Sequence, residues 1–281
     1  MKLSQARIGL LILAVLLTTS GCGVINRIRA KNEINEAARA YKAGKFAEAE
    51  QHSKRALELN PDDKNAPFFI ARTIHAQYKP GVDTPENLQK AREAIDAYKK
   101  LLDKDPSNEE AYKAIAALYG ALKEQDTQRQ WIMQRATKDG VDPKLRAEAY
   151  TVLASQDWNC SYAITELPEN KPTVNKDGKP TIQYKKPKEQ SDFDKAQQCV
   201  TRGLEEAEKA ISLDPDNDTA WSFKTNLLLE SAKLAEMDGK MEDKAKFSQQ
   251  AKEAQDKTTQ LSNQKKQAEE EAKKTPKQPA S

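Results

Sequence analysis

The sequence predicts an all-α protein in which helical hairpins stack into a solenoid. Charged residues make up 32% of the 281 residues and aromatic residues only 6%, and Ala, Lys, Glu, Gln and Leu dominate, which is typical of helices. The stretches "ALELNPDD", "LLDKDPSN" and "AISLDPDN" are alike, and "ATKDGVDP" is a weaker fourth. In chain order, their prolines lie 45, 37 and 72 residues apart, so each interval exceeds 34 residues, by 11, 3 and 38 residues respectively. A period of about 34 residues with insertions is typical of a helical array.

The first 21 residues have the layout of an export signal. Lys2 and Arg7 precede an apolar run from Ile8 to Leu17, and small residues from Thr18 to Gly21 follow. The run is shorter than the roughly 20 apolar residues that cross a bilayer. We therefore predict that residues 1–21 are removed on export.

The residue directly after this segment, Cys22, belongs to a second recognisable motif. Thr19-Ser20-Gly21-Cys22 resembles the lipobox of bacterial lipoproteins, although that family prefers Leu where this chain has Thr19. The resemblance implies cleavage before Cys22 and acylation of its thiol and new amino terminus, with palmitate among the acyl chains. Several acyl chains anchor a protein stably, so residues 22–29 would be a short membrane-proximal linker. The alternative is an ordinary signal peptide with an incidental cysteine.

Residues 30–254 resemble tetratricopeptide repeats. In that family the first helix carries W-x2-L-G-x2-Y, and the second carries A-x3-F and ends at a proline. "YKAIAALY" from Tyr112 follows the first half, and Ala94-x3-Tyr98 with Pro106 follows the second. The resemblance implies a right-handed solenoid of about five hairpins, with small residues where helices cross closely.

Two insertions interrupt the predicted solenoid. Residues 78–88 form a loop within the second hairpin, since they hold two prolines and a glycine. Residues 161–192, within the fourth, lose the helical pattern and hold four prolines, and Asp177-Gly178 suits a short hairpin. A loop of this length is usually functional or disordered.

The tail, residues 255–281, holds good helix formers but no apolar stripe. Leu261 is its one large apolar residue. We expect a polar helix that nothing buries, ending near Lys274, followed by disorder from Thr275 to Ser281.

The two remaining cysteines fall on one predicted hairpin. On the repeat, Cys160 lies at the end of a first helix and Cys199 near the start of the second. Antiparallel helices meet there, within the roughly 6 Å between Cα atoms that a disulfide needs, and exported proteins keep such bonds. We predict a Cys160–Cys199 disulfide; the alternative is two buried free thiols.

Catalytic and metal-binding patterns are absent from the sequence. It contains no HExxH, phosphate loop, GxSxG or CxxC, and His52 and His75 lie on different predicted helices. Without Lys2 and Arg7, 44 basic and 43 acidic residues remain, so charge does not predict nucleic-acid binding. We predict no catalytic residue, no metal and no cofactor besides the lipid on Cys22. An enzyme with an unrecognised site is one alternative to the function predicted below.

Two surfaces are candidates for partner binding. The first is the inner face lined by the first helices of the repeats, where aromatic, Arg and Asn side chains suit an extended peptide. Its predicted residues are Tyr41, Phe68, Arg72, His75, Lys113, Trp158 and Asn226. Phe68 and Trp158 equally suit packing between neighbouring helices.

The second surface is a basic patch on the long insertion. It comprises Lys171, Lys176, Lys179, Tyr184, Lys185, Lys186 and Lys188, with Asp177 as the single acid among them. The alternatives are a solvated flexible stretch and a docking patch for an acidic partner, anionic lipid or cell-wall polymer.

Taken together, these features predict a membrane-tethered interaction scaffold on the periplasmic side of a bacterial membrane. Gly23 after the cysteine is similar to lipoproteins sent to the outer membrane. The expected partners are other envelope proteins or extended peptides, and the resemblance to repeat lipoproteins implies a role in envelope assembly or secretion. The alternative is a periplasmic receptor that binds a small ligand or glycan in its groove or loop. The sequence leaves the partner and the oligomeric state open.

Overall fold

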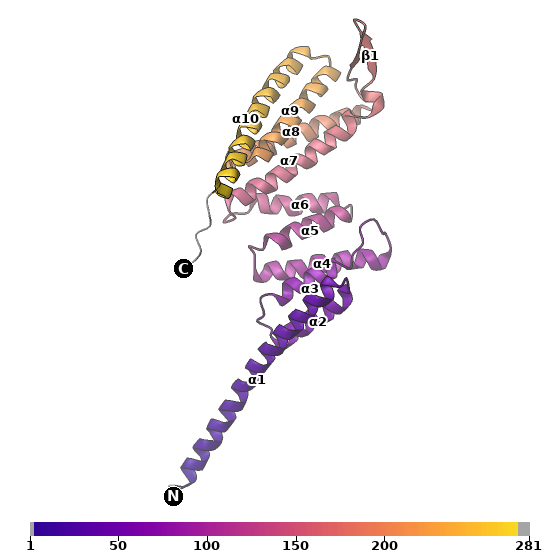
Figure 1. Cartoon of the computed structure of the whole chain (residues 1–281). Coiled ribbons are helices and arrows are strands. Elements are labelled where there is room, and N and C mark those ends of the chain that lie inside the picture. Colours follow the sequence, from indigo (N-terminus) through magenta and orange to yellow (C-terminus); the bar gives the residue numbers. More distant parts are fainter. Residues whose placement is uncertain (1–2, 275–281) are drawn as a thin grey trace. The chain divides into compact units, whose positions relative to one another are not determined.

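The computed structural model describes the backbone of residues 3–274 and the side chains of residues 23–273. The predicted lipid site at Cys22 and the predicted disorder of 275–281 lie outside the described residues. Within them the chain is almost wholly helical (Figure 1), which confirms the all-α class. The elements are α1 (Leu3–Lys42), α2 (Phe46–Leu59), α3 (Ala66–His75), α4 (Pro85–Lys104), α5 (Glu109–Ala121), α6 (Gln125–Thr137), α7 (Pro143–Thr165), η1 (Pro168–Asn170), β1 (Thr173–Lys176), β2 (Lys179–Ile182), α8 (Gln190–Leu213), α9 (Asp218–Met237) and α10 (Met241–Lys274).

The chain divides into two compact units, residues 1–128 and 129–281, and the division falls within α6. In unit 1, α1 packs on α2, α3 packs on α2 and α4, and α4 packs on α5. In unit 2, α7 packs on α8 and α9, and α9 packs on α8 and α10. Within the units, consecutive helices pair as hairpins: α1 with α2 and α3 with α4 in unit 1, and α7 with α8 and α9 with α10 in unit 2. The long insertion separates α7 from α8, as predicted for the fourth hairpin.

The repeated Asp-Pro motifs are the places where one hairpin ends and the next begins. Asn108 and Asn217, the last residues of "DPSN" and "DPDN", each precede a helix, and their side chains accept hydrogen bonds from the backbone of Ala111 and Ala220. Such caps satisfy amide groups that lack a partner within the helix. The motif is therefore both a helix stop and the next helix start.

Small residues lie where the helices cross, as the repeat resemblance implies. Ala49 and Ala56 of α2, and Ala207 of α8, are fully buried. At Gly203 of α8, a Cβ atom would lie 2.7 Å from the Leu227 side chain and 3.0 Å from that of Asp157. A glycine is thus required for the close approach of α7, α8 and α9.

The long insertion is shorter and more ordered than predicted. Residues 161–165 continue α7, because Ser161 and Thr165 donate hydrogen bonds of 3.0 and 2.7 Å to the buried Glu230 carboxylate; α8 already begins at Gln190. The hairpin at Asp177-Gly178 is confirmed: both residues have positive φ, 54° and 77°, as a two-residue type I′ turn requires. The first insertion likewise ends early, since α4 begins at Pro85.

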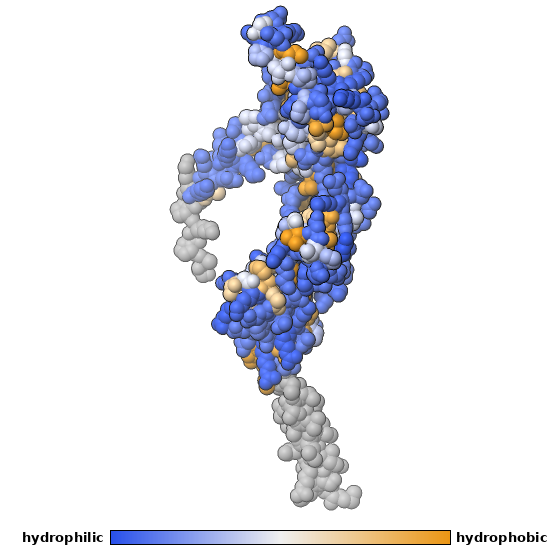
Figure 2. Space-filling model, turned by 90° about the vertical axis from the view of Figure 1, so that its right-hand side faces the viewer, coloured by the Kyte–Doolittle hydropathy of each residue, from blue (hydrophilic) through white to orange (hydrophobic). Residues whose placement is uncertain are grey.

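Both ends of the described chain differ from expectation. Residues 23–29, predicted as a linker, belong to helix α1. The expectation that nothing buries the tail is wrong: Leu261 of α10 is only 5% exposed, since α10 packs along α9. Among the described residues no helix has the length and apolar character of a membrane span. The face in Figure 2 is mostly hydrophilic, with apolar residues in small groups.

Candidate interaction groove

The candidate site is a groove in unit 1 with a volume of about 630 Å³. Its walls come from α1, α3, α4 and α5 and from the loop after α3. Four of the predicted groove residues line it together: Tyr41, Arg72, His75 and Lys113. Tyr78, Tyr98 and Glu110 add to its polar lining. The groove forms because α1, α3 and α5 are the first helices of successive hairpins and present the same face.

Arg72 is the centre of the groove. Its guanidinium carbon lies 5.2 Å from the centre of the Tyr41 ring and 6.0 Å from that of Phe68. Its Nε donates a 3.4 Å hydrogen bond to the Tyr41 hydroxyl, and Nη1 lies 4.0 Å from a Glu110 carboxylate oxygen. Two rings thus orient the cation by cation–π contact, while the side chain stays exposed to an incoming ligand.

His75 and Tyr98 form the buried side of the groove. The rings meet edge to face with centres 5.8 Å apart, and His75 Nδ1 lies 3.3 Å from the Tyr98 hydroxyl. Burial lowers the pKa of His75 below its usual 6.5, so the imidazole is neutral at pH 7. Burial, together with the Glu110 charge, raises the pKa of Tyr98 to about 12. Both groups serve as neutral hydrogen-bonding groups.

This arrangement suits recognition rather than bond cleavage. Arg72 and Lys113 offer donors to carboxylate or carbonyl oxygens, Glu110 accepts from amide groups, and Tyr41 supplies an aromatic wall. Over residues 23–273, no group of three His, Cys, Asp or Glu side chains is arranged to hold a metal ion. The groove can thus hold an extended chain that carries both polar backbone groups and acidic side chains.

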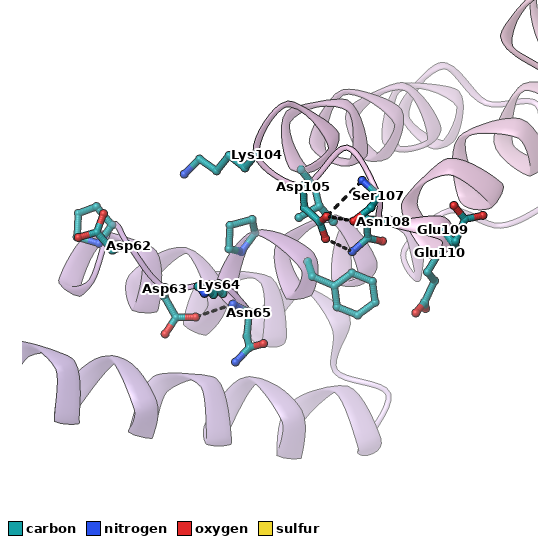
Figure 3. Close-up of a pocket in the computed structure, with 14 residues that line it drawn as sticks. Asp62, Asp63, Lys64, Asn65, Lys104, Asp105, Ser107, Asn108, Glu109 and Glu110 are labelled. Carbon is teal, nitrogen blue, oxygen red and sulfur yellow. Dashed lines mark hydrogen bonds between the residues drawn. The ribbon is translucent and has the colours of Figure 1, made fainter. Parts of the chain in front are cut away.

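Phe68 lies at the edge of a second, larger hollow of about 1050 Å³ between the α2–α3 and α4–α5 turns (Figure 3). Half of its labelled side chains are acidic, and two are lysines. Several of these groups are already engaged: Asp105 accepts hydrogen bonds from Ser107 and Asn108, and Asp63 from the backbone of Asn65. This hollow therefore has the character of two capped turns.

Trp158 and Asn226, the other two predicted groove residues, belong to unit 2. Trp158 packs against the buried cluster of Ala154, Ala207 and Leu227, and its ring centre lies 5.1 Å from that of Tyr162. Asn226 is half-buried on α9. Trp158 therefore serves the packing of α7 on α8 and α9, one of the two roles that its sequence position allows.

Unit 2 also contains a buried charge cluster that the sequence analysis missed. Asp157 is 1% exposed and Glu206 is 2% exposed. Arg202 Nε donates a 2.8 Å hydrogen bond to Asp157, and Arg129 lies 3.1 Å from Asp157 and also pairs with Glu206. Burial and the nearby Asp157 charge raise the pKa of Glu206 to about 8.

The predicted disulfide lies one helical turn from this cluster. Cys160 and Cys199 are bonded, with Cα atoms 6.1 Å apart. Cys160 follows Asp157 by three residues on α7, and Cys199 precedes Arg202 by three on α8. Both cysteines lie further inside their helices than predicted, because α7 and α8 extend beyond the expected ends. The bond and the ion pair together clamp α7 to α8.

The basic patch on the insertion is divided between base and tip. At the base, Lys171 pairs with Glu166, Lys186 lies 2.5 Å from Asp238, and Tyr184 donates a 3.1 Å hydrogen bond to Glu166. Burial pushes the pKa of Glu166 upward, but hydrogen bonds from Lys171 and Lys233 outweigh it and lower the pKa to about 2. Lys176, Lys179, Lys185 and Lys188 are exposed. The seven residues thus do not act as one surface.

Among the groove residues missed by sequence reasoning are Tyr98 and Glu110. Tyr98 matches the aromatic position of the repeat pattern and so suggested packing alone. Glu110 lies in the first turn of α5, where an acid is explained by the helix dipole. For the buried cluster a signal existed: Glu206 lies between Gly203 and Ala207, on the small-residue face of α8.

Comparisons with known proteins give a likeness of fold. No family model matches the sequence, and no curated protein sequence matches it significantly. Among solved structures, a double mutant of MamA RS-1 is 15% identical, with a TM-score of 0.43, over 84% of this chain and 96% of that one. A tetratricopeptide repeat protein from Parabacteroides merdae is 14% identical (TM-score 0.35; 83% and 97%). The TPR2AB domain of yeast Sti1, solved as a pHSP90 complex, is 16% identical (TM-score 0.30; 82% and 98%). The helix pairs and groove of this chain define it by themselves as a helical-repeat protein.

Proposed function

We propose that this chain is a lipid-anchored protein of the bacterial envelope that binds extended segments of other envelope proteins through the unit 1 groove. The observation that carries the proposal is Arg72, a cation in contact with two aromatic rings yet open to a ligand. An arginine oriented in this way is a typical anchor of a protein interface. The protein would act as a non-enzymatic scaffold in envelope assembly or secretion.

The membrane attachment is supported by the sequence alone. Thr19-Ser20-Gly21-Cys22 places a cysteine directly after an export signal, and Gly23 favours the outer membrane, with the domain on its periplasmic side. Mass spectrometry of the N-terminal peptide of the membrane-extracted protein tests this step. We expect a chain that begins at Cys22 and carries acyl groups; an unmodified Cys22 would exclude the anchor.

The binding role is tested by affinity purification from solubilised envelopes. We expect Arg72→Ala to reduce the recovery of a stoichiometric protein partner at least about tenfold, the loss typical of an interface anchor. Arg55→Ala is the matched control, because Arg55 is an exposed arginine of the same unit that pairs with Glu58 on its own helix. Equal loss in both variants would point to a general charge effect and contradict the proposal.

A groove of about 630 Å³ also lies within the size range of small-molecule sites. The same purification separates the two functions. If no protein is enriched and native mass spectrometry finds a small molecule or glycan on the purified chain, the groove belongs to a ligand receptor instead.

A further inference from the structure

The first described turns of α1 carry an apolar surface that nothing in unit 1 covers. Val24 and Ile28 are each 59% exposed, and Ile25 is 51% exposed. No other five-residue stretch among residues 23–273 holds three exposed large apolar side chains. Residues 23–29 precede the first buried residue, Ala30, and the N-terminal part of α1 runs clear of the other helices in Figure 1.

Helix geometry places these three side chains on one face. At 100° per residue, Val24, Ile28 and Ile25 span an arc of about 100°. Ala30 and Ala37, which pack on the body of unit 1, lie roughly opposite this arc. The apolar arc, Val24, Ile25 and Ile28, therefore faces away from the fold, so core packing does not explain it.

The polar residues around the arc indicate what covers it. Arg29 lies on one side of the arc, and Arg27 and Lys31 lie on the other; all three are exposed. Long basic side chains beside an apolar face can reach anionic headgroups while the apolar groups enter the acyl boundary. A second protein copy would not require cations on both flanks.

We propose that the apolar arc inserts into the interface of an anionic bilayer, with Arg27, Arg29 and Lys31 on the lipid headgroups. The inference rests on the proposed membrane attachment and adds a second contact beside the acyl chains. The lipid alone would leave unit 1 free to swivel, whereas an inserted helix face sets which side of α1 meets the membrane. The groove would then be presented in one orientation.

Photo-crosslinking tests which face meets lipid. The full chain, extracted from membranes and reconstituted in phosphatidylethanolamine–phosphatidylglycerol vesicles, carries benzoylphenylalanine at position 28 or at position 26, where Asn26 lies on the body side of α1. We expect about tenfold more lipid adduct from position 28, as for a helix that lies in the interface. Equal adducts at both positions, or a protein adduct at position 28, would overturn the proposal.

Trypsin provides a second readout, because Arg27 and Arg29 are themselves cleavage sites. We expect Val24→Ser/Ile25→Ser/Ile28→Ser to accelerate cleavage there about tenfold on the same vesicles, since the arc no longer inserts. The matched control is Val82→Ser/Val152→Ser/Leu229→Ser, which alters three exposed apolar residues elsewhere and should leave the rate unchanged. The single variant Ile28→Ser, whose site lies further from Cys22, should also accelerate cleavage.

The outcomes separate this proposal from the proposed function. Wild-type cleavage as fast as that of the triple variant would refute the inserted arc, while partner recovery through Arg72 would be unaffected. Replacing phosphatidylglycerol by phosphatidylcholine should also accelerate wild-type cleavage several-fold, because the basic flanks lose their anionic partners. No acceleration would contradict the headgroup contacts. The mass of the N-terminal peptide reports in each sample whether the lipid itself is present.

Discussion

The two units are built from the same hairpins but place their charges differently. In unit 1, the groove cation Arg72 is oriented by rings and remains exposed. In unit 2, Arg129 and Arg202 pair with the buried acids Asp157 and Glu206, and Lys233 pairs with the buried Glu230. The disulfide between Cys160 and Cys199 also lies in unit 2.

The exposed charge of unit 1 suits the binding of a partner, whereas the buried charges of unit 2 hold its helices together. A charge that is to bind a partner must stay hydrated until the partner arrives, and its contribution to folding is small. A buried charge with all its partners is costly to disturb, because removal of one partner leaves another uncompensated. Unit 1 should therefore tolerate substitution of its groove charges, whereas unit 2 should not tolerate substitution of its buried ones.

The largest loss in the free energy of unfolding of unit 2 is expected from Asp157→Ala. Removal of this carboxylate leaves Arg202 and Arg129 with one buried acid between them, and loss of one partner of a buried ion pair costs about 3–5 kcal/mol. Trp131, Trp158 and Trp221 all lie in unit 2, so urea unfolding followed by tryptophan fluorescence reports on this unit alone.

The matched control in unit 1 is Glu110→Ala, which removes an exposed groove carboxylate 4.0 Å from Arg72. Circular dichroism, which follows the helices of both units, should give an unchanged midpoint for this variant. A loss of less than about 1 kcal/mol for Asp157→Ala would show that the buried cluster is not an obligatory part of unit 2.

The next effect is expected from Cys160→Ser/Cys199→Ser. The bond closes a sequence separation of 39 residues, and loss of such a link costs about 2–4 kcal/mol. Fluorescence-detected unfolding should shift to lower urea, and amide exchange of residues 166–189 should accelerate. Unit 1 is the internal reference in the same exchange experiment, and equal acceleration in its helices would contradict a local clamp.

A smaller effect is expected from pH. Because the folded pKa of Glu206 lies at about 8, above the ordinary 4.5, the native state holds a proton that the unfolded state releases. The stabilising contribution is complete below pH 4.5 and is lost as pH rises toward about 8. We expect unit 2 to lose stability progressively as the pH rises from 5 to 8.

Glu206→Gln is the control for this titration, because the amide keeps the shape and cannot ionise. Its unfolding midpoint should be nearly constant between pH 5 and 8. Glu166, whose pKa is lowered to about 2, acts in the opposite sense only below pH 4.5 and so does not mask the effect. A wild-type midpoint that rises with pH in this window would contradict the assignment to Glu206.

The fold could be predicted from sequence because each hairpin is specified locally. Ala and Gly lie at the crossings, and a proline lies at each hairpin boundary, with a capping Asn108 or Asn217 at two of them. The repeat period of about 34 residues remains visible once the insertions are removed. The disulfide followed from the hairpin. The C-terminal end of α7 was mispredicted because Ser161 and Thr165 look like loop residues. Their burial depends on Glu230, which is 69 and 65 residues away, respectively.

The site was only partly predictable for a similar reason. Repeat position predicts which side chains face inward, and four of the predicted residues, Tyr41, Arg72, His75 and Lys113, line one groove. Repeat position does not show which charged side chains form ion pairs within the fold. Lys171 and Lys186 look like members of a free basic patch. In the structure, however, Lys171 pairs with Glu166 within the insertion, and Lys186 pairs with Asp238 after α9.

The smallest effect is expected at the tip of the β-hairpin, and it contrasts tip with base in the insertion itself. Lys176 and Lys179 are directly opposite each other in the register, and like charges so placed are destabilising. Lys179→Gln should therefore leave unit 2 unchanged or stabilise it by up to about 0.5 kcal/mol. Lys186→Gln should shift unfolding to lower urea, because it loses the Asp238 pair and the contact with the Phe193 ring. Urea unfolding of both variants checks the contrast; an equal loss in each would mean that the tip is packed as firmly as the base.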